Sequence, residues 1–195
     1  MAGHVALEPR TRPPVAPGTV NSVAPFEIRT FGDPVLRQRA AEITTLDEVV
    51  AQLAADMLVT MYEAPGVGLA APQVGVQRRL FVYDINDGNG PHTVINPVLM
   101  GHQGEQTSEE GCLSVPGLSW PLTRYNQVHL TGVDLDGKEL SIDAEGLLAR
   151  CFQHEVDHLD GMLLLERLEK RERKNAMKSL RHRTLGLPEP AGESS

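Results

Sequence analysis

Apolar residues recur at helical spacing in two long segments of the chain. Between Leu46 and Tyr62 they line one face of a predicted helix, which Pro65 ends, and they are Leu46, Val49, Val50, Leu53, Met57, Leu58 and Met61. From Ala144 to Leu159 they recur at spacings of one, three and four, with Asp143 as N-cap and Gly161 as the stop. In this second segment the apolar residues cover a wide part of the helix surface, which predicts a helix that runs through the interior.

Alternating and β-branched runs between these helices predict strands. They occupy Leu80–Ile85, Thr93–Leu99, Gln127–Asp134 and Lys138–Ile142. Asp136-Gly137 is a strong hairpin signal between the last two segments. Asn96-Pro97 predicts that the second strand ends at an edge, and Asp33-Pro34 predicts a short helical turn with Leu36 packed inward. A helix, antiparallel strands and a further helix are typical of an α+β fold.

The domain organisation follows from composition. Residues 1–25 are rich in proline and lack the apolar run of a signal peptide, so we expect a disordered or loosely packed extension. Residues 26–184 suit one domain with a full core, and residues 185–195 suit a flexible tail. No segment is long enough to cross a membrane, and the chain has only two cysteines, so we expect a cytoplasmic protein without a disulfide scaffold.

Charge is segregated along the chain. The stretch from Arg167 to Arg183 lacks glycine and proline and carries a net charge of +6, whereas the whole chain carries −8. We therefore expect a basic C-terminal helix over residues 166–183. This helix has two interpretations: a solvated face supported by pairs such as Glu169 with Arg173, or a surface that docks on a polyanion.

The sequence H-E-x-x-H lies within the predicted central helix. His154 and His158 share one helix face, so both can bind one metal ion, with Glu155 beside them as a proton carrier. Polar groups inside an apolar helix need a partner, and a metal supplies one. The alternative is a polar helix whose histidines are merely solvated or hydrogen-bonded. The metal interpretation predicts hydrolysis by activated water.

A third protein ligand is needed for a catalytic metal site. The extended motif with a third histidine is excluded, because that position holds Leu164. Cys112 is the better candidate, since a thiolate is a strong ligand and three protein ligands leave one position open. The alternative ligands are glutamates of the charged C-terminal stretch, Glu166, Glu169 and Glu172. Cys151 fits a small buried packing residue, three positions before His154.

Three motifs together resemble the peptide deformylase family. G-x-G-L-A-A-P-Q matches Gly66 to Gln73, which is not a phosphate loop because it lacks G-K-[ST]. E-G-C-L-S matches Glu110 to Ser114, and Q-H-E-x-D-H-L-x-G matches Gln153 to Gly161. The resemblance runs from about Phe26 to about Arg183. It implies antiparallel sheets packed around a central helix that carries H-E-x-x-H, followed by a C-terminal helix.

The resemblance also implies the reaction and the cofactor. The family removes the N-formyl group from the initiator methionine of nascent polypeptides and releases formate, a step of co-translational N-terminal processing. It implies one divalent metal on Cys112, His154 and His158, natively Fe(II), with zinc, nickel or cobalt also able to occupy a site of this type. Metal-activated water would attack the formyl carbon, with Glu155 as general base and then general acid.

Further roles are carried over by the same resemblance. The oxyanion donors would be the Gln73 side-chain amide and the Leu113 backbone N–H. The peptide would lie extended against Gly66–Gly68 in the manner of an added strand. The methionine pocket would be lined by Val67, Leu147, Arg150, Cys151 and His154. For Arg150 we expect either an apolar stem in this pocket or a solvated charge.

Support for the metal ligands is expected from an ion pair between Glu110 and Arg124, with two independent surface charges as the alternative. Ser119 departs from the pattern, because some members place a peptide-contacting arginine there. The implied partners are formyl-methionyl nascent chains and, through the basic helix, the ribosome; neither DNA nor a membrane is expected. Two other classes remain, an endopeptidase and an inactive ribosome-binding module, and intact Glu155 argues against the second.

Overall fold

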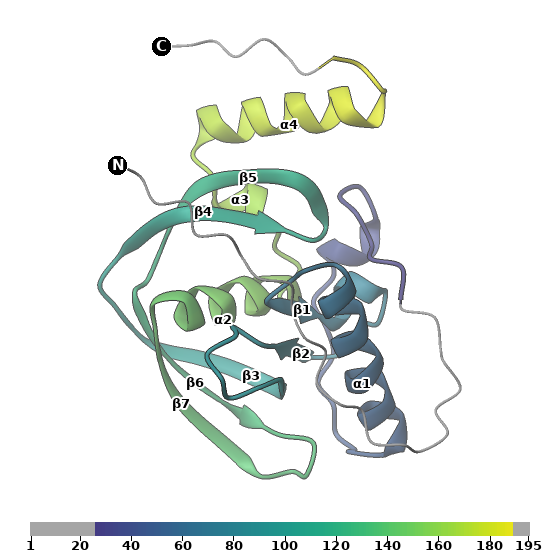
Figure 1. The fold of residues 1–195 in the computed structure, drawn as a ribbon, viewed down its shortest axis with the longest axis vertical. Coiled ribbons are helices and arrows are strands. Elements are labelled where there is room, and N and C mark those ends of the chain that lie inside the picture. Colours follow the sequence, from purple (N-terminus) through teal and green to yellow (C-terminus); the bar gives the residue numbers. More distant parts are fainter. Residues whose placement is uncertain (1–25, 189–195) are drawn as a thin grey trace.

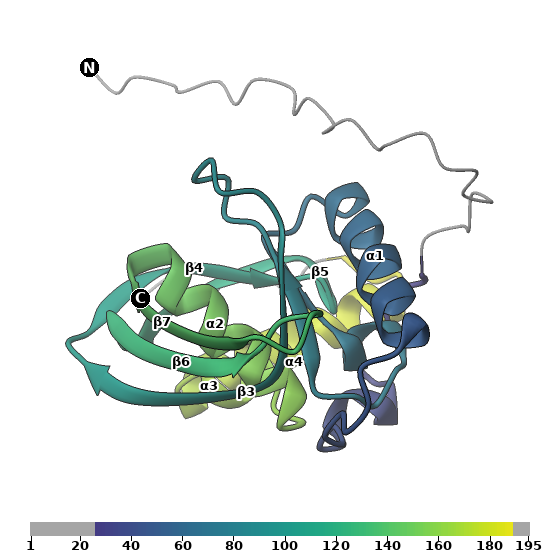
Figure 2. The ribbon, with the colours of Figure 1, turned by 90° about the horizontal axis from the view of Figure 1, so that it is seen from below.

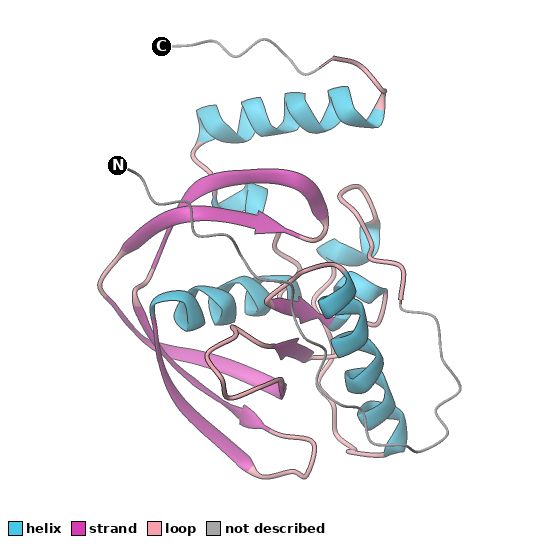
Figure 3. Cartoon of the chain, viewed as in Figure 1, coloured by secondary structure: helices cyan, strands magenta, loops and turns pink. Residues whose placement is uncertain are grey.

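The computed structural model describes residues 26–188. The expectations for residues 1–25 and for residues 189–195 lie outside this part of the chain. Within it, none of the helices is long and apolar enough to cross a membrane. Two antiparallel sheets and a helix between them make up the fold (Figures 1 and 3), so the predicted α+β architecture is confirmed.

The larger sheet has five strands in the order β1-β2-β3-β6-β7, and each neighbouring pair is antiparallel. The strands are β1 (Gly68–Ala70), β2 (Leu80–Tyr83), β3 (His92–Gln103), β6 (Gln127–Val133) and β7 (Glu139–Glu145). β2 is wholly buried, which explains its continuous apolar run, and Val94 and Ile95 beside it in β3 are also buried. The predicted hairpin around Asp136-Gly137 joins β6 to β7.

The smaller sheet is a hairpin that the hydrophobic pattern did not predict. It consists of β4 (Gln106–Cys112) and β5 (Val115–Arg124). The buried residues of β4 are Glu110 and Cys112, at its end, and the positions before them are exposed or half-buried, so the apolar alternation of a half-buried strand is missing. We refer to β4 and β5 together as the ligand hairpin, because it carries Cys112.

Helix α2 (Gly146–Leu159) lies between the five-stranded sheet and the ligand hairpin (Figure 1). On the sheet side, the ring of Phe152 packs against Phe81 and Tyr83, with centroid separations of 5.9 and 5.0 Å. Such aromatic contacts bury much apolar surface and fix the helix on the sheet. Both faces of α2 are therefore covered, as its broad apolar coat predicts.

The remaining helices surround this centre. They are the 3-10 turns η1 (Pro34–Arg37) and η2 (Ala71–Val74), and the helices α1 (Glu48–Glu63), α3 (Leu164–Arg167) and α4 (Lys170–Thr184). Helix α1 packs beside β1 and β2 at one end of the molecule (Figure 2). Helix α4 lies on the far side of the ligand hairpin from α2 (Figure 1). A small core joins the hairpin to α3 and α4 and includes Val115, Leu122, Leu164, Leu165 and Ala176.

Several predicted boundaries are wrong for identifiable reasons. Asn96-Pro97 does not end its strand at an edge: β3 continues to Gln103 at the centre of the sheet, with a register shift that takes up the two residues. Helix α2 begins at Gly146 with Glu145 as N-cap, because Asp143 is still paired in β7. Helix α1 has Asp47 as its N-cap, whose carboxylate accepts from two backbone N–H groups.

The C-terminal helix is also shorter than predicted. A break at Leu168, which is extended and buried, separates α3 from α4. Arg167 therefore belongs to a different element from the other basic residues, and its guanidinium binds Asp157 of α2 although the side chain remains exposed. The predicted short turn with Leu36 buried is confirmed as η1.

Candidate metal centre and substrate cavity

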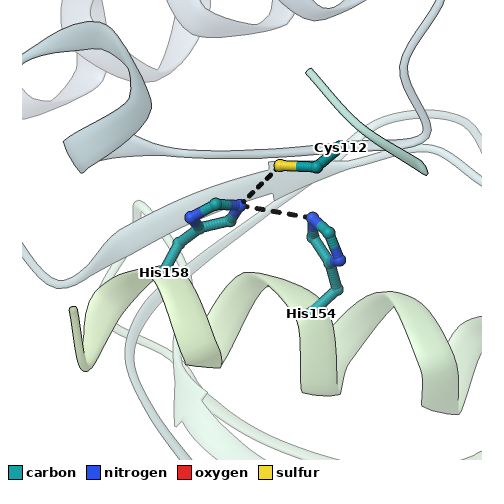
Figure 4. Close-up of side chains that lie close together, drawn as sticks. All are labelled: Cys112, His154 and His158. Carbon is teal, nitrogen blue, oxygen red and sulfur yellow. Dashed lines mark hydrogen bonds between the residues drawn. The ribbon is translucent and has the colours of Figure 1, made fainter. Parts of the chain in front are cut away.

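Three potential metal ligands converge between α2 and the ligand hairpin (Figure 4). His154 and His158 project from one face of α2, and Cys112 approaches them from the end of β4. The His158 Nε2 atom lies 3.2 Å from Cys112 Sγ and 3.2 Å from His154 Nε2. All three ligand atoms lie within 4.8 Å of one another.

This geometry fits a tetrahedral metal ion. Ligand atoms about 2.0–2.3 Å from a common tetrahedral centre are separated from one another by roughly 3.3–3.7 Å. The observed separations of 3.2 Å agree with this spacing. A ligand set of one thiolate and two imidazoles suits a transition metal and leaves the fourth position free for catalysis.

The pKa of Cys112 points in the same direction, whereas the pKa of His154 is raised by the thiolate beside it, and His154 must lose its proton to bind a metal. Burial works to raise the pKa of the Cys112 thiol, but His158 and His154 outweigh it and hold that pKa well below its usual range. Burial likewise works to lower the pKa of His154, and the nearby Cys112 outweighs it and raises the pKa. The cysteine is thus poised as a thiolate, which is the form that binds a metal.

Glu155 lies beside the ligands and is almost fully buried, with 3% of its surface exposed. Its Oε2 atom has no hydrogen-bond partner among the described residues. Burial raises the pKa of this carboxyl from 4.5 to about 7, with the two histidines acting in the opposite sense. A carboxyl with a pKa near neutrality, aimed at the cluster, can both accept and return a proton.

The predicted ion pair between Glu110 and Arg124 is present as a fork of 2.7 and 3.2 Å. The same carboxylate also accepts from Arg150 at 2.6 Å and lies 2.7 Å from His154 Nδ1. Burial works to raise the pKa of Glu110, but the bonds with His154 and Arg124 outweigh it and hold the pKa well below its usual range. The charge of Arg150 is therefore not solvated.

The hydrogen-bond chain extends through two residues that sequence reasoning missed. Arg124 also donates to Asp157 at 2.6 Å, and Asp157 in turn accepts from Arg167 at 2.5 Å. Asp157 lies inside the H-E-x-x-H segment and Arg167 inside the basic stretch, so both were assigned to other features. The alternative ligand Glu166 is engaged elsewhere, because it accepts from Arg37 at 2.5 Å.

Gln73 and Leu113 lie next to the cluster. The side-chain Oε1 atom of Gln73 accepts from the Ala70 backbone N–H, which orients the side chain so that Nε2 lies 3.2 Å from Ser114 Oγ and 3.8 Å from Cys112 Sγ. Gln73 is buried, so its amide is held in one direction. A donor fixed beside the ligands can stabilise charge that develops on a reacting oxygen.

A cavity of about 800 Å³ opens onto the cluster. Every residue expected along the peptide or in the methionine pocket lines it, namely Gly66, Val67, Gly68, Leu147, Arg150, Cys151 and His154. Leu147 is half exposed at its mouth, and the departure Ser119 also contributes to the wall. The cavity therefore joins the ligands, Glu155 and the glycine loop in one concave site.

The chain matches known proteins over most of its length. The family model for polypeptide deformylase matches residues 25–174. A peptide deformylase 1 of Corynebacterium efficiens is 52% identical over 159 residues, which cover 80% of this chain and 94% of that protein. A peptide deformylase of Acidothermus cellulolyticus is 49% identical and covers 79% of this chain and 84% of its own length.

Solved structures agree with this match. A crystal structure of a peptide deformylase from Legionella pneumophila has a TM-score of 0.78 at 41% identity, and covers 86% of this chain and all of that one. One from Synechococcus elongatus in complex with actinonin has a TM-score of 0.77 at 37% identity, and covers 86% and 91%. On its sequence, its fold and the arrangement of its site, the chain belongs to the peptide deformylase family.

Proposed function

We propose that this chain removes the N-formyl group from the initiator methionine of nascent polypeptides and releases formate. The observation that carries the proposal is the convergence of Cys112, His154 and His158 at the base of a cavity, with the buried Glu155 carboxyl beside them. The family match supports the same reaction. Formylated chains emerge from ribosomes, so the reaction is placed in the cytoplasm.

Cys112, His154 and His158 would hold the metal. A divalent ion bound there would supply Lewis-acid chemistry and lower the pKa of water. Fe(II) is the proposed native ion, and zinc, nickel or cobalt suit the same donor set. Metal analysis of protein purified without oxygen tests this choice, and a predominance of zinc with full activity would contradict it.

The chain's own residues carry the proton and the charge. Glu155 accepts a proton from the attacking water and returns it to the leaving amine, for which a pKa of about 7 is suited. The Gln73 amide and the Leu113 backbone N–H donate to the oxygen on which negative charge develops. Their positions at the cavity wall, next to Cys112, support this assignment.

The substrate peptide lies extended along the backbone of Gly66–Gly68. Main-chain hydrogen bonds of this kind give affinity without selecting side chains, which suits an enzyme that must accept many sequences. The methionine side chain enters a pocket whose wall includes Leu147, Cys151 and the aliphatic stem of Arg150. The guanidinium of Arg150 is turned away onto Glu110, so the stem alone is available to the pocket.

The decisive experiment measures formate release from a formyl-methionyl peptide by anaerobically purified, Fe(II)-loaded protein. We expect Cys112→Ala and Glu155→Ala to abolish release. His129→Ala is a matched control, because this histidine also pairs with a carboxylate, Asp143, but on the outer surface of the sheet. An inactive metal-replete wild type would refute the function, and cleavage of blocked internal peptides would favour an endopeptidase.

The basic face of α4 supports a second proposal, association with the ribosome. Its seven lysines and arginines are exposed, and α4 lies on the opposite side of the ligand hairpin from α2. Binding to a polyanion through such a face weakens as salt rises. We expect co-sedimentation with ribosomes at low salt, lost in Lys174→Glu/Lys178→Glu, with activity on short peptides unchanged. Equal co-sedimentation of both proteins would contradict the proposal.

A further inference from the structure

The three proposed metal ligands belong to two separate elements. His154 and His158 are fixed to each other by one turn of α2, whereas Cys112 stands on the ligand hairpin. No β-sheet hydrogen bonds join this hairpin to the five-stranded sheet among the described residues. Beyond its chain connections to β3 and β6, the hairpin is fastened to α2 by side chains, and these help to set the geometry of the ligand set.

Arg150 makes the most extensive of these fastenings. It lies on α2, one helical turn before His154, and only 5% of its surface is exposed. Its Nη1 atom donates to Glu110 at 2.6 Å, while its Nη2 atom donates to the backbone carbonyls of Gln106 at 3.2 Å and Leu122 at 3.0 Å. One guanidinium thus contacts a side chain of β4 and the main chain of both hairpin strands.

The same contact reaches His154. Arg150 donates to the Oε2 atom of Glu110, and the Oε1 atom of that carboxylate lies 2.7 Å from His154 Nδ1. Together with the fork from Arg124, this bond fixes the rotation of the carboxylate and so the position of its Oε1 atom. A carboxylate on Nδ1 selects the imidazole form whose Nε2 is free for a metal.

We propose that Arg150 is a positioning residue, which holds Cys112 and His154 in register for the metal. It does so by clamping the ligand hairpin to α2 and by fixing the Glu110 carboxylate. This inference rests on the proposed metal site. The competing account is that Arg150 only lends its aliphatic stem to the methionine pocket, in which case loss of its charge with the stem retained would leave metal affinity and kcat unchanged.

Arg150→Met separates the two accounts, because it keeps an unbranched apolar stem of similar reach and removes every donor. Arg79→Met is the matched control. Arg79 is similarly buried, donates to a carboxylate of Asp160 at 2.6 Å and to the Pro97 carbonyl at 3.3 Å, and takes no part in the ligand cluster. Comparing the two variants removes the general effect of losing a buried arginine.

The primary readout is the dissociation constant for Co(II), measured by competition with a chelator. We expect Arg150→Met to weaken binding by about 10–100-fold, the range for partners that support metal ligands. Arg79→Met should stay within about threefold of wild type, the spread expected from context alone. The thiolate-to-cobalt absorption band should shift in the first variant only. In steady-state assays we expect kcat to fall more than KM rises.

Arg150→Lys keeps a positive charge and tests rescue. A single ammonium can satisfy Glu110 but cannot reach both strands in the fork geometry of a guanidinium, so its Co(II) affinity should lie between wild type and Arg150→Met. This variant also decides the question if Arg150→Met does not fold. Wild-type affinity and an unchanged absorption band in Arg150→Lys, together with a lowered melting temperature, would overturn the proposal.

The failures are distinguishable. If wild type binds Co(II) and Arg150→Met binds it equally well, with kcat unchanged, then the clamp is refuted and the pocket-stem account remains. If both methionine variants lose affinity equally, the effect is general destabilisation and the clamp is again refuted. If wild type itself binds no Co(II) and releases no formate, then the metal site and the function fail, and the clamp falls with them.

Discussion

Gly68 passes so close to Glu155 that a single methyl group added there must displace the proposed proton carrier. A Cβ atom on Gly68 would overlap the Glu155 carboxylate, lie 2.8 Å from its Cδ atom and lie 3.0 Å from Cys151 Sγ. Glu155 is 3% exposed and lines the cavity, so its carboxyl can give way only by leaving its present place beside the ligands. The substitution Gly68→Ala therefore perturbs the site without changing any group that takes part in the chemistry.

The size of the effect follows from the overlap. Ordinary contacts between carbon atoms lie at about 3.5–4.0 Å, so the carboxyl group must move by roughly 1 Å. A misplacement of about 1 Å in a catalytic group costs on the order of 100-fold in rate, or about 2.7 kcal/mol of transition-state stabilisation. We expect kcat to fall by about this factor, while the protein folds and binds its metal.

The assay compares Gly68→Ala with two matched variants. In Gly66→Ala the added Cβ would meet the flexible end of Leu113 at 2.8 Å, which can rotate away, so kcat should fall far less. In Gly132→Ala it would meet the Ile95 carbonyl at 2.9 Å, away from the ligand cluster, which controls for stability. Wild-type kcat in Gly68→Ala, or equal losses in all three variants, would refute the reasoning.

Three further outcomes are expected. Glu155→Gln keeps the volume of the side chain but removes its proton chemistry, so kcat should fall by about 10²–10⁴-fold with Co(II) affinity retained, as read by chelator competition. Removal of the metal by a chelator should lower the melting temperature reversibly. A metal at 100 times its dissociation constant adds about 2.7 kcal/mol to stability. An unchanged melting temperature in calorimetry would argue against a metal site in the native state. Gly161 has φ +74° and a Cβ there would lie 2.8 Å from the Arg37 backbone, so Gly161→Ala should lose about 2 kcal/mol or more in urea unfolding, with kcat per folded molecule unchanged.

Features set by neighbours along the chain could be predicted from the sequence. The spacing of His154 and His158 alone places both on one helix face, and the structure has them 3.2 Å apart at Nε2. The apolar coat of α2 predicted its central position, which Phe152 and its aromatic neighbours confirm. In each case a local period determines the structure, so a single sequence is sufficient.

The ligand hairpin shows where local patterns are insufficient. The buried positions at the end of β4 hold Glu110 and Cys112 rather than apolar residues, because that face serves the site instead of a hydrophobic core. The alternation of apolar and polar residues that marks a half-buried strand is therefore absent here, because residues of the site occupy the buried positions. The same cause hid Arg150, whose charge reads as solvent-exposed until its partners on another element are known.

The buried charges near the ligands have a role that apolar residues in the same positions could not fill. Glu110, Arg124 and Asp157 form a continuous chain of bonds from His154 to Arg167, which lies beyond the helix that carries the ligand. Moving such charges out of water is costly, and apolar residues of similar volume stabilise a fold as well or better. Stability alone therefore does not explain this series of buried hydrogen bonds. Its role in orienting the imidazole of His154 does explain it, because each bond restricts the next residue and the last one restricts His154.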